Sequence, residues 1–86
     1  MNNRLNAAER RHLERVKSLP CGVCGAPPVS EAHHIEQHKQ WICIPLCQEC
    51  HTGRGGIHRE KHMWRVYKAT ELSVLDDTIR KLMEGA

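Results

Sequence analysis

Two cysteine pairs of the same spacing restrict the fold of this sequence more than any other feature. Cys21 and Cys24 form the first pair, and Cys47 and Cys50 form the second. Each pair can wrap a tight turn that directs two thiolates at one ion, and two pairs complete the closed tetrahedral site typical of structural Zn²⁺. The sequence therefore predicts that these four cysteines converge on one structural zinc ion.

The composition of the chain indicates why a metal ion is needed. The sequence has 86 residues, only 3% aromatic residues and no Phe. A chain of this length buries only about 60% of its unfolded surface, so its apolar core alone is marginal. Metal binding supplies roughly 10 kcal/mol or more to the folding of comparable modules. Cys43 belongs to neither pair, and we expect it to be a small, buried apolar residue.

Local patterns predict an α+β fold. The first helix is predicted over residues 5–18, with Asn3 or Asn6 as its N-cap and Pro20 after its end. Residues 29–35 and 41–46 are short β-like runs around a polar turn, which predicts a hairpin between the two cysteine pairs. The apolar face predicted for the first helix comprises Leu5, Ala8, Leu13, Val16 and Leu19.

Two further helices are predicted after the second cysteine pair. One runs from about Ile57 to Lys68, and the other is capped by Thr70 or Ser73 and stops near Gly85. The apolar residues of the last helix recur at helical spacing and are Leu72, Leu75, Ile79, Leu82 and Met83. We expect residues 1–86 to form one domain, with an N-terminal helix (1–20), a zinc knuckle, hairpin and histidine motif (21–58) and C-terminal helices (59–86).

Charge and hydropathy exclude some classes of protein. The formal net charge is +3, and cations gather in residues 1–18 and 54–68, on both sides of the cysteine region. No apolar run approaches the roughly 20 residues of a membrane span, and no apolar signal segment follows the first residues. We therefore expect no membrane partner and a reducing compartment. A thiol redox protein is disfavoured because no βαβ pattern follows either cysteine pair.

Histidines are concentrated around the cysteines. A site of four thiolates needs no further ligand, yet His33, His34, His51 and His58 all lie close to it in sequence. This pattern predicts a second metal site. Adjacent strand residues point to opposite faces, so His33 and His34 can divide two roles between them, one binding an ion and the other facing a substrate. We expect the remaining histidines His12 and His38 to be solvated.

These motifs together resemble a zinc-stapled HNH endonuclease, a member of the ββα-metal (His-Me finger) nucleases. The resemblance covers about residues 21–58, and the chain from Pro45 to Ile79 most resembles the phage Ref-like, RecA-dependent nuclease group. The motifs that carry it are the first Cys-x-x-Cys, Glu31-Ala32-His33-His34-Ile35, Ile44-Pro45-Leu46-Cys47-Gln48-Glu49-Cys50-His51 and Gly56-Ile57-His58.

The resemblance implies a small ββα-metal finger that hydrolyses phosphodiester bonds in DNA. It implies that His34 is the general base, that His33 and His58 bind a catalytic divalent ion, Mg²⁺ or another metal, and that His51 is a ligand as in some members. His62 follows His58 at a spacing of four residues, which is a helical spacing for two metal ligands. Either His51 or His62 can therefore be the third ligand. The resemblance further implies a phage or prophage protein of the bacterial cytoplasm, active in DNA recombination, with a RecA filament as a partner.

One position departs from the family pattern. Ile42 stands where the motif Asn orients the base, and either Gln40 or a backbone carbonyl is left to take that role. The cations beside the motif are candidates for contacts with DNA phosphates, because Arg and Lys bind phosphate oxygens. They are Arg54, Arg59, Lys61 and Arg65.

The few aromatic residues are expected to serve packing. Trp64 and Tyr67, with Ile57 and Leu72, are predicted to cover the zinc knuckle, and for Trp41 we expect packing in the core rather than stacking on bases. The alternative function is a non-catalytic zinc module that binds DNA or a protein partner. That alternative explains the cysteines and the cations, but not the accompanying histidines.

Overall fold

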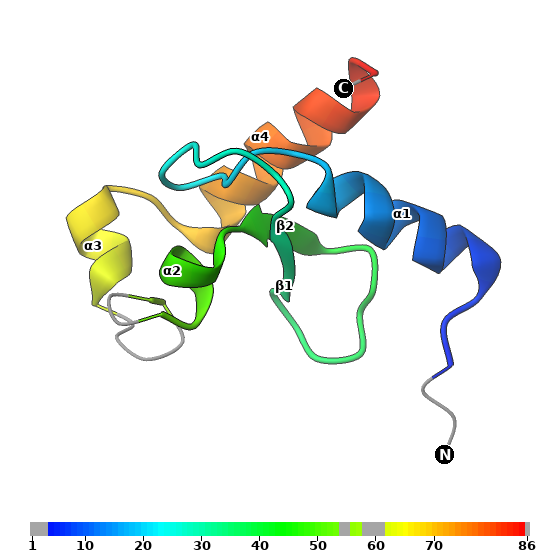
Figure 1. Ribbon diagram of the computed structural model, residues 1–86. Coiled ribbons are helices and arrows are strands. Elements are labelled where there is room, and N and C mark those ends of the chain that lie inside the picture. Colours follow the sequence, from blue (N-terminus) through cyan, green and yellow to red (C-terminus); the bar gives the residue numbers. More distant parts are fainter. Residues whose placement is uncertain (1–3, 54–55, 58–61, 86) are drawn as a thin grey trace.

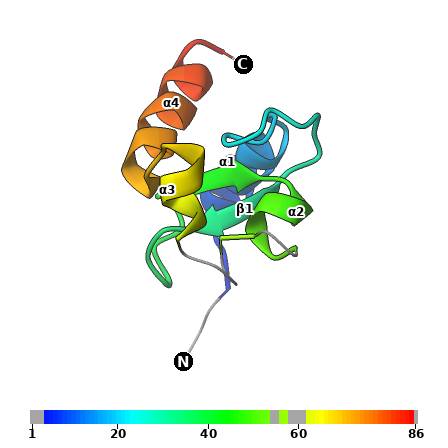
Figure 2. The same cartoon turned by 90° about the vertical axis from the view of Figure 1, so that its left-hand side faces the viewer.

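The computed structural model describes residues 4–53, 56–57 and 62–85. In these ranges four helices surround a two-stranded sheet, which confirms the small α+β fold (Figure 1). Figure 1 shows the sheet at the centre, with α1 on one side and α2 and α3 on the other, and Figure 2 shows α1 behind the strands and α4 to one side of them. The elements in chain order are α1 (Ala7–Lys17), β1 (Glu31–His34), β2 (Cys43–Leu46), α2 (Gln48–His51), α3 (Met63–Tyr67) and α4 (Glu71–Met83).

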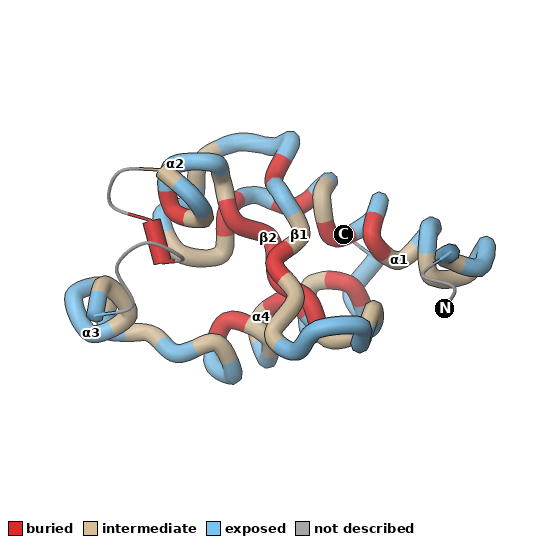
Figure 3. The backbone as a smooth tube through the Cα atoms, turned by 90° about the horizontal axis from the view of Figure 1, so that it is seen from below, coloured by how far each residue is buried: buried red, intermediate tan, exposed pale blue. Residues whose placement is uncertain are grey.

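The two strands form the predicted antiparallel hairpin. The register places Glu31 opposite Leu46 and His34 opposite Cys43. Every residue of β2 is buried (Figure 3), because the sheet is covered on both faces. Cys43 packs into an apolar cluster with residues of α1 and α4. The apolar cluster on the other face of the sheet contains Cys21 and Cys50. The prediction that Cys43 is buried outside the cysteine pairs is confirmed.

Helix α1 agrees with its sequence pattern. Asn6, rather than Asn3, is the N-cap, and it forms a capping box with Glu9. Of the predicted apolar face, Leu13, Val16 and Leu19 are buried in one cluster and Leu5 packs against it. The helix is also tied to the far end of the chain, because Arg15 Nη2 donates a 2.8 Å hydrogen bond to the carbonyl oxygen of Leu82.

The segment after β2 differs from the prediction. The second cysteine pair opens the short helix α2, which the sequence pattern did not indicate. Ile57 lies in a turn and does not begin a helix, because its backbone N–H donates a 2.8 Å hydrogen bond to the carbonyl of Cys50 at the end of α2. Helix α3 starts at Met63 and stops at Lys68, whose φ of 56° is left-handed. Residues 58–61 of the predicted helix lie outside the described residues.

Helix α4 has the predicted cap but buries a different face. Thr70 caps it reciprocally with Ser73, and Gly85 follows its end with a positive φ. Leu72, Ile79 and Met83 of the predicted apolar stripe are exposed and were wrong, whereas Leu82 is buried and Leu75 packs against the core. The buried row is Val74, Thr78 and Leu82. Thr78 can lie there because its hydroxyl donates to the carbonyl of Val74 at 2.8 Å.

Leu72 and Leu82 provide a matched test of this correction. Leu82→Ala removes a buried side chain between α1 and α4, and we expect it to lower the free energy of unfolding by about 2 kcal/mol or more. Leu72→Ala makes the same chemical change at an exposed position and should cost less than about 0.5 kcal/mol. Urea unfolding of both variants measures the difference. Equal costs would show that the two faces of α4 are wrongly assigned.

Candidate functional site

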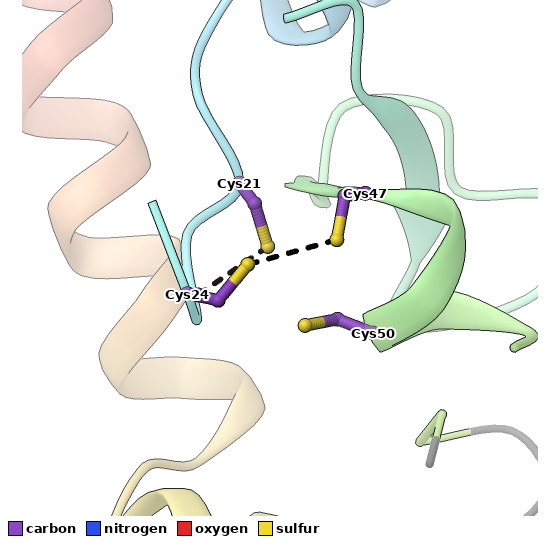
Figure 4. Close-up of side chains that lie close together, drawn as sticks. All are labelled: Cys21, Cys24, Cys47 and Cys50. Atoms are coloured by element: carbon purple, nitrogen blue, oxygen red, sulfur yellow. Dashed lines mark hydrogen bonds between the residues drawn. The ribbon is translucent and has the colours of Figure 1, made fainter. Parts of the chain in front are cut away.

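Four cysteine side chains converge beside the sheet (Figure 4). Cys21 and Cys24 lie in the turn that follows α1, Cys47 follows β2, and Cys50 lies in α2. Their four sulfur atoms all lie within 4.8 Å of one another, and the Sγ atoms of Cys24 and Cys47 are 3.6 Å apart. Zn–S bonds of about 2.3 Å place tetrahedral sulfurs about 3.8 Å apart. This cysteine cluster (Cys21, Cys24, Cys47 and Cys50) could therefore hold a structural metal ion such as zinc.

The backbone of the first turn is shaped to hold sulfur. The N–H groups of Val23 and Cys24 point at Cys21 Sγ, at 3.4 and 3.5 Å. Burial favours the neutral thiol of Cys21, but backbone N–H donors from Cys24, Cys47 and Val23 outweigh it and lower its pKa to about 7. Gly22 allows the turn to approach α4, because a Cβ there would lie 2.5 Å from Val74 Cγ1.

The surroundings of Cys50 and Cys24 favour their neutral thiols. Burial raises the pKa of Cys50, and hydrogen bonding to the neighbouring Cys24 and Cys47 side chains raises it further. Burial likewise raises the pKa of Cys24. A divalent cation offsets such penalties because metal ligation deprotonates a coordinating thiol. The donor set could therefore become four thiolates around a bound divalent cation.

Apolar residues cover the cysteine cluster. Ile57 is buried against Cys21 and Cys50, and Trp64 and Tyr67 pack on the same cluster from α3. Burial raises the pKa of the Tyr67 hydroxyl, and the nearby Cys50 thiol raises it further. The prediction that these three residues cover the knuckle is confirmed. Leu72 was wrongly included, since it points into solvent from α4.

A second polar group lies at the end of β1. His33 is buried, and its Nε2 is 2.6 Å from Glu71 Oε2 at the start of α4. The ring of His51, at the end of α2, stands edge-on to the His33 ring with 5.1 Å between centroids. His51 Nδ1 is in turn 2.8 Å from Glu31 Oε1 on β1. Three elements therefore bring two imidazoles and two carboxylates together.

The His34 ring does not share the contacts of His33 and His51 and is held by Gln40 instead. Its Nε2 is 2.7 Å from Gln40 Oε1 in the loop between the strands. Because the amide oxygen can only accept, His34 Nε2 carries the proton and Nδ1 is the ring nitrogen that remains an acceptor. Gln40 was one of two candidates from the sequence for orienting this imidazole, and the structure shows this contact. We call His33, His34 and His51, with Glu31, Gln40 and Glu71, the histidine site.

A cavity of about 350 Å³ opens at the histidine site. Both His33 and His34 border it, although they leave β1 on opposite faces, because they lie at the end of the strand. Glu71 borders it from α4 and Trp64 from α3. The full lining in the described part of the chain is His33, His34, Ile35, Gln37, Ile57, Trp64 and Glu71. A ligand in this cavity would contact both histidines.

The remaining predicted site residues fall into two groups. His58, Arg54, Arg59 and Lys61 lie outside the described residues. His62 is exposed at the start of α3, and Arg65 is exposed on the same helix. Among the described residues, only the cysteine cluster brings His, Cys, Asp or Glu ligand atoms as close together as a metal site requires.

Sequence reasoning gave no role to two carboxylates. Glu31 is two residues before His33 and therefore on the same face of β1, which is a signal that strand periodicity could have supplied. Glu71 pairs with His33 across 38 residues of sequence, and no local pattern indicates such a contact. Both carboxylates accept hydrogen bonds at the histidine site.

Comparison with protein families, with curated proteins and with solved structures finds no match for this chain. Among the helices of the described ranges, none is long and apolar enough to span a membrane.

Zinc content tests the assignment of the cysteine cluster. Cys24→Ala removes one of the four converging sulfurs, so the purified protein should lose its bound zinc and much of its stability. Cys43→Ala removes a sulfur that lies apart from the cluster, in the opposite core, and should keep one zinc ion per chain. Elemental analysis after gel filtration in mild chelator measures both. Equal zinc contents in the two variants would contradict the assignment.

Proposed function

We propose that this protein is a metal-dependent DNA endonuclease of the HNH type that hydrolyses phosphodiester bonds. The observation that carries the proposal is the 2.7 Å hydrogen bond between His34 Nε2 and Gln40 Oε1 beside a cavity that His33 also borders. A general base needs a fixed ring and an acceptor nitrogen that a water molecule can reach. Gln40 supports both requirements, since it fixes the ring and leaves Nδ1 of His34 to accept the proton of the attacking water.

The second requirement is a divalent ion, which this proposal assigns to the histidine site. In this proposal His33 and His51 bind the ion, His58 adds a ligand from the adjacent segment, and His62 remains the alternative to His51. Imidazole suits transition metals and carboxylate suits Mg²⁺ or Mn²⁺, so the mixed donor set is compatible with several divalent ions. When bound, such an ion stabilises negative charge on the phosphate and on the leaving oxygen.

The ring of His33 is fixed as a metal-binding histidine usually is. One ring nitrogen of such a histidine donates to a carboxylate, which sets the tautomer and the ring orientation. His33 Nε2 is 2.6 Å from Glu71 Oε2, and His51 Nδ1 is 2.8 Å from Glu31 Oε1. Each imidazole thus has one nitrogen within hydrogen-bond distance of a carboxylate, which fixes the orientation of its ring.

The substrate proposed for this site is DNA. Arg65 is exposed on α3 next to Trp64, which borders the cavity, and it is proposed to contact phosphate together with Arg54, Arg59 and Lys61. A RecA filament on the DNA is proposed as a partner that stimulates cleavage, and the bacterial cytoplasm as the place where it occurs.

Nicking of supercoiled plasmid DNA tests the activity. With zinc-loaded protein and added Mg²⁺, Mn²⁺ or Ni²⁺, we expect nicking by the wild type and a loss of about 10²- to 10⁴-fold in His34→Ala, which lacks the base. His38→Asn is the matched control, because it changes another histidine of the same loop and Asn tolerates its left-handed φ of 68°. Its nicking rate should equal that of the wild type.

Two results would overturn the proposal. The first is no nicking by the folded wild type with any of these ions, with or without a RecA filament. The second is equal nicking by wild type and His34→Ala. DNA binding without nicking would favour the non-catalytic zinc module.

Gln40→Leu tests the positioning of the base. Leucine has a similar size but cannot accept the hydrogen bond from His34 Nε2, so the ring loses its fixed orientation. With an oligonucleotide substrate we expect kcat to fall roughly tenfold or more while KM stays within a factor of two, since a positioning residue acts on the chemical step. Zinc content should remain that of the wild type. A change in KM alone would contradict this role.

A further inference from the structure

The indole of Trp41 is half exposed, although packing in the core was expected of it. Its exposed fraction is 53%, in a chain whose only other aromatic residues are Trp64 and Tyr67. Trp41 lies in the loop before β2 and outside both apolar clusters of the described residues. Leaving a large apolar ring in water gives up the stabilisation of burial, so its position calls for another explanation.

The exposed ring is held in place by α1. His12 Nε2 is 3.0 Å from the carbonyl oxygen of Trp41, and the two rings pack with centroids 4.8 Å apart at an angle of 41°. His12 is therefore not simply solvated, as was expected, but anchors the loop to the helix. A ring fixed in this way loses little conformational entropy when a ligand stacks on it.

Two arginines of α1 lie beside the ring. Residues Ala8, Arg11, His12 and Arg15 are spaced as one face of α1, and with Trp41 they line a hollow of about 240 Å³. Arg11 and Arg15 are exposed, and in the described ranges no carboxylate lines this hollow. A neighbouring hollow along α1 adds Arg10, with one carboxylate, Glu14. The surface around Trp41 therefore favours an anionic ligand that has flat apolar parts.

We propose that Trp41, Arg11 and Arg15 form a stacking site for an unpaired base of single-stranded DNA. Proteins that bind single strands combine aromatic rings on which bases stack with cations that track the phosphates. Bases inside a duplex are covered on both faces by their neighbours, so an indole can stack only on a base that has left the duplex. The same cations without Trp41 would suffice for duplex phosphates, and an apolar protein partner would not need them.

The stacking site adjoins the histidine site along the chain. Trp41 directly follows Gln40, whose side chain holds His34. The loop between β1 and β2, which carries both residues, lies between α1 and the α2–α3 side of the molecule (Figure 1). The inference shares with the proposed function only DNA as the partner, and it does not require that the DNA be cut.

Tryptophan fluorescence gives a direct test. In a full-length Trp64→Phe protein, Trp41 is the only indole, and we expect a 12-nucleotide oligo(dT) to quench it in buffer without added divalent ion. In separate binding measurements, Trp41→Ala should raise the Kd for this oligonucleotide roughly tenfold or more, and Trp41→Phe should retain most of the affinity. Leu72→Ala is the matched control, because it removes another exposed apolar side chain and should leave the Kd unchanged.

Three results would overturn the stacking site. They are an unquenched indole at saturating oligonucleotide, an unchanged Kd in folded, zinc-loaded Trp41→Ala, and an equal dependence on Trp41 for duplex DNA of the same length. Repeating the titration in His34→Ala separates this inference from nuclease activity. Trp41-dependent binding without any nicking by the wild type would support the stacking site and contradict only the proposed nuclease activity. Nicking with no role for Trp41 in binding would support the nuclease activity and contradict the stacking site.

Discussion

The convergence of four sulfurs is the constraint on which the other features depend. The turn that carries Cys21 and Cys24 follows α1, whereas Cys47 and Cys50 follow the hairpin, so the cluster joins the two ends of the β segment. The Gly22 N–H donates a 2.8 Å hydrogen bond to the Pro45 carbonyl on β2 and continues that junction in the backbone. His51 directly follows Cys50, so the position of the cluster also fixes the position of one imidazole of the histidine site.

The histidine site shows how a small domain can orient several imidazoles without a large core. Each ring has its own acceptor, and each acceptor comes from a different element: Glu71 from α4, Gln40 from the loop and Glu31 from β1. Long polar side chains lose rotamer entropy when they are fixed, but charge-assisted hydrogen bonds offset part of this loss. The three rings are thereby held from several directions, and those of His33 and His34 border the cavity.

Sequence reasoning succeeded where the signal is local and failed where it depends on packing. Cysteine spacing indicated the cluster, and Asn6 and Thr70 were recognisable caps because their partners lie three residues away. The face of α4 was wrong because buried Thr78 satisfies its hydroxyl within the helix and so is not recognisable as a core residue. The contact between Glu71 and His33, like the exposure of Trp41, follows from tertiary packing alone.

Helix α4 contacts both apolar clusters and the histidine site. Val74 packs into the core beside the cysteines, Leu82 packs into the core against α1, and Glu71 holds His33. A rigid helix transmits a displacement at one of these points to the other two. We therefore expect oxidation of a cysteine in the cluster to weaken the contact between Glu71 and His33 as well. The thiols would then be a point of chemical vulnerability for the whole domain.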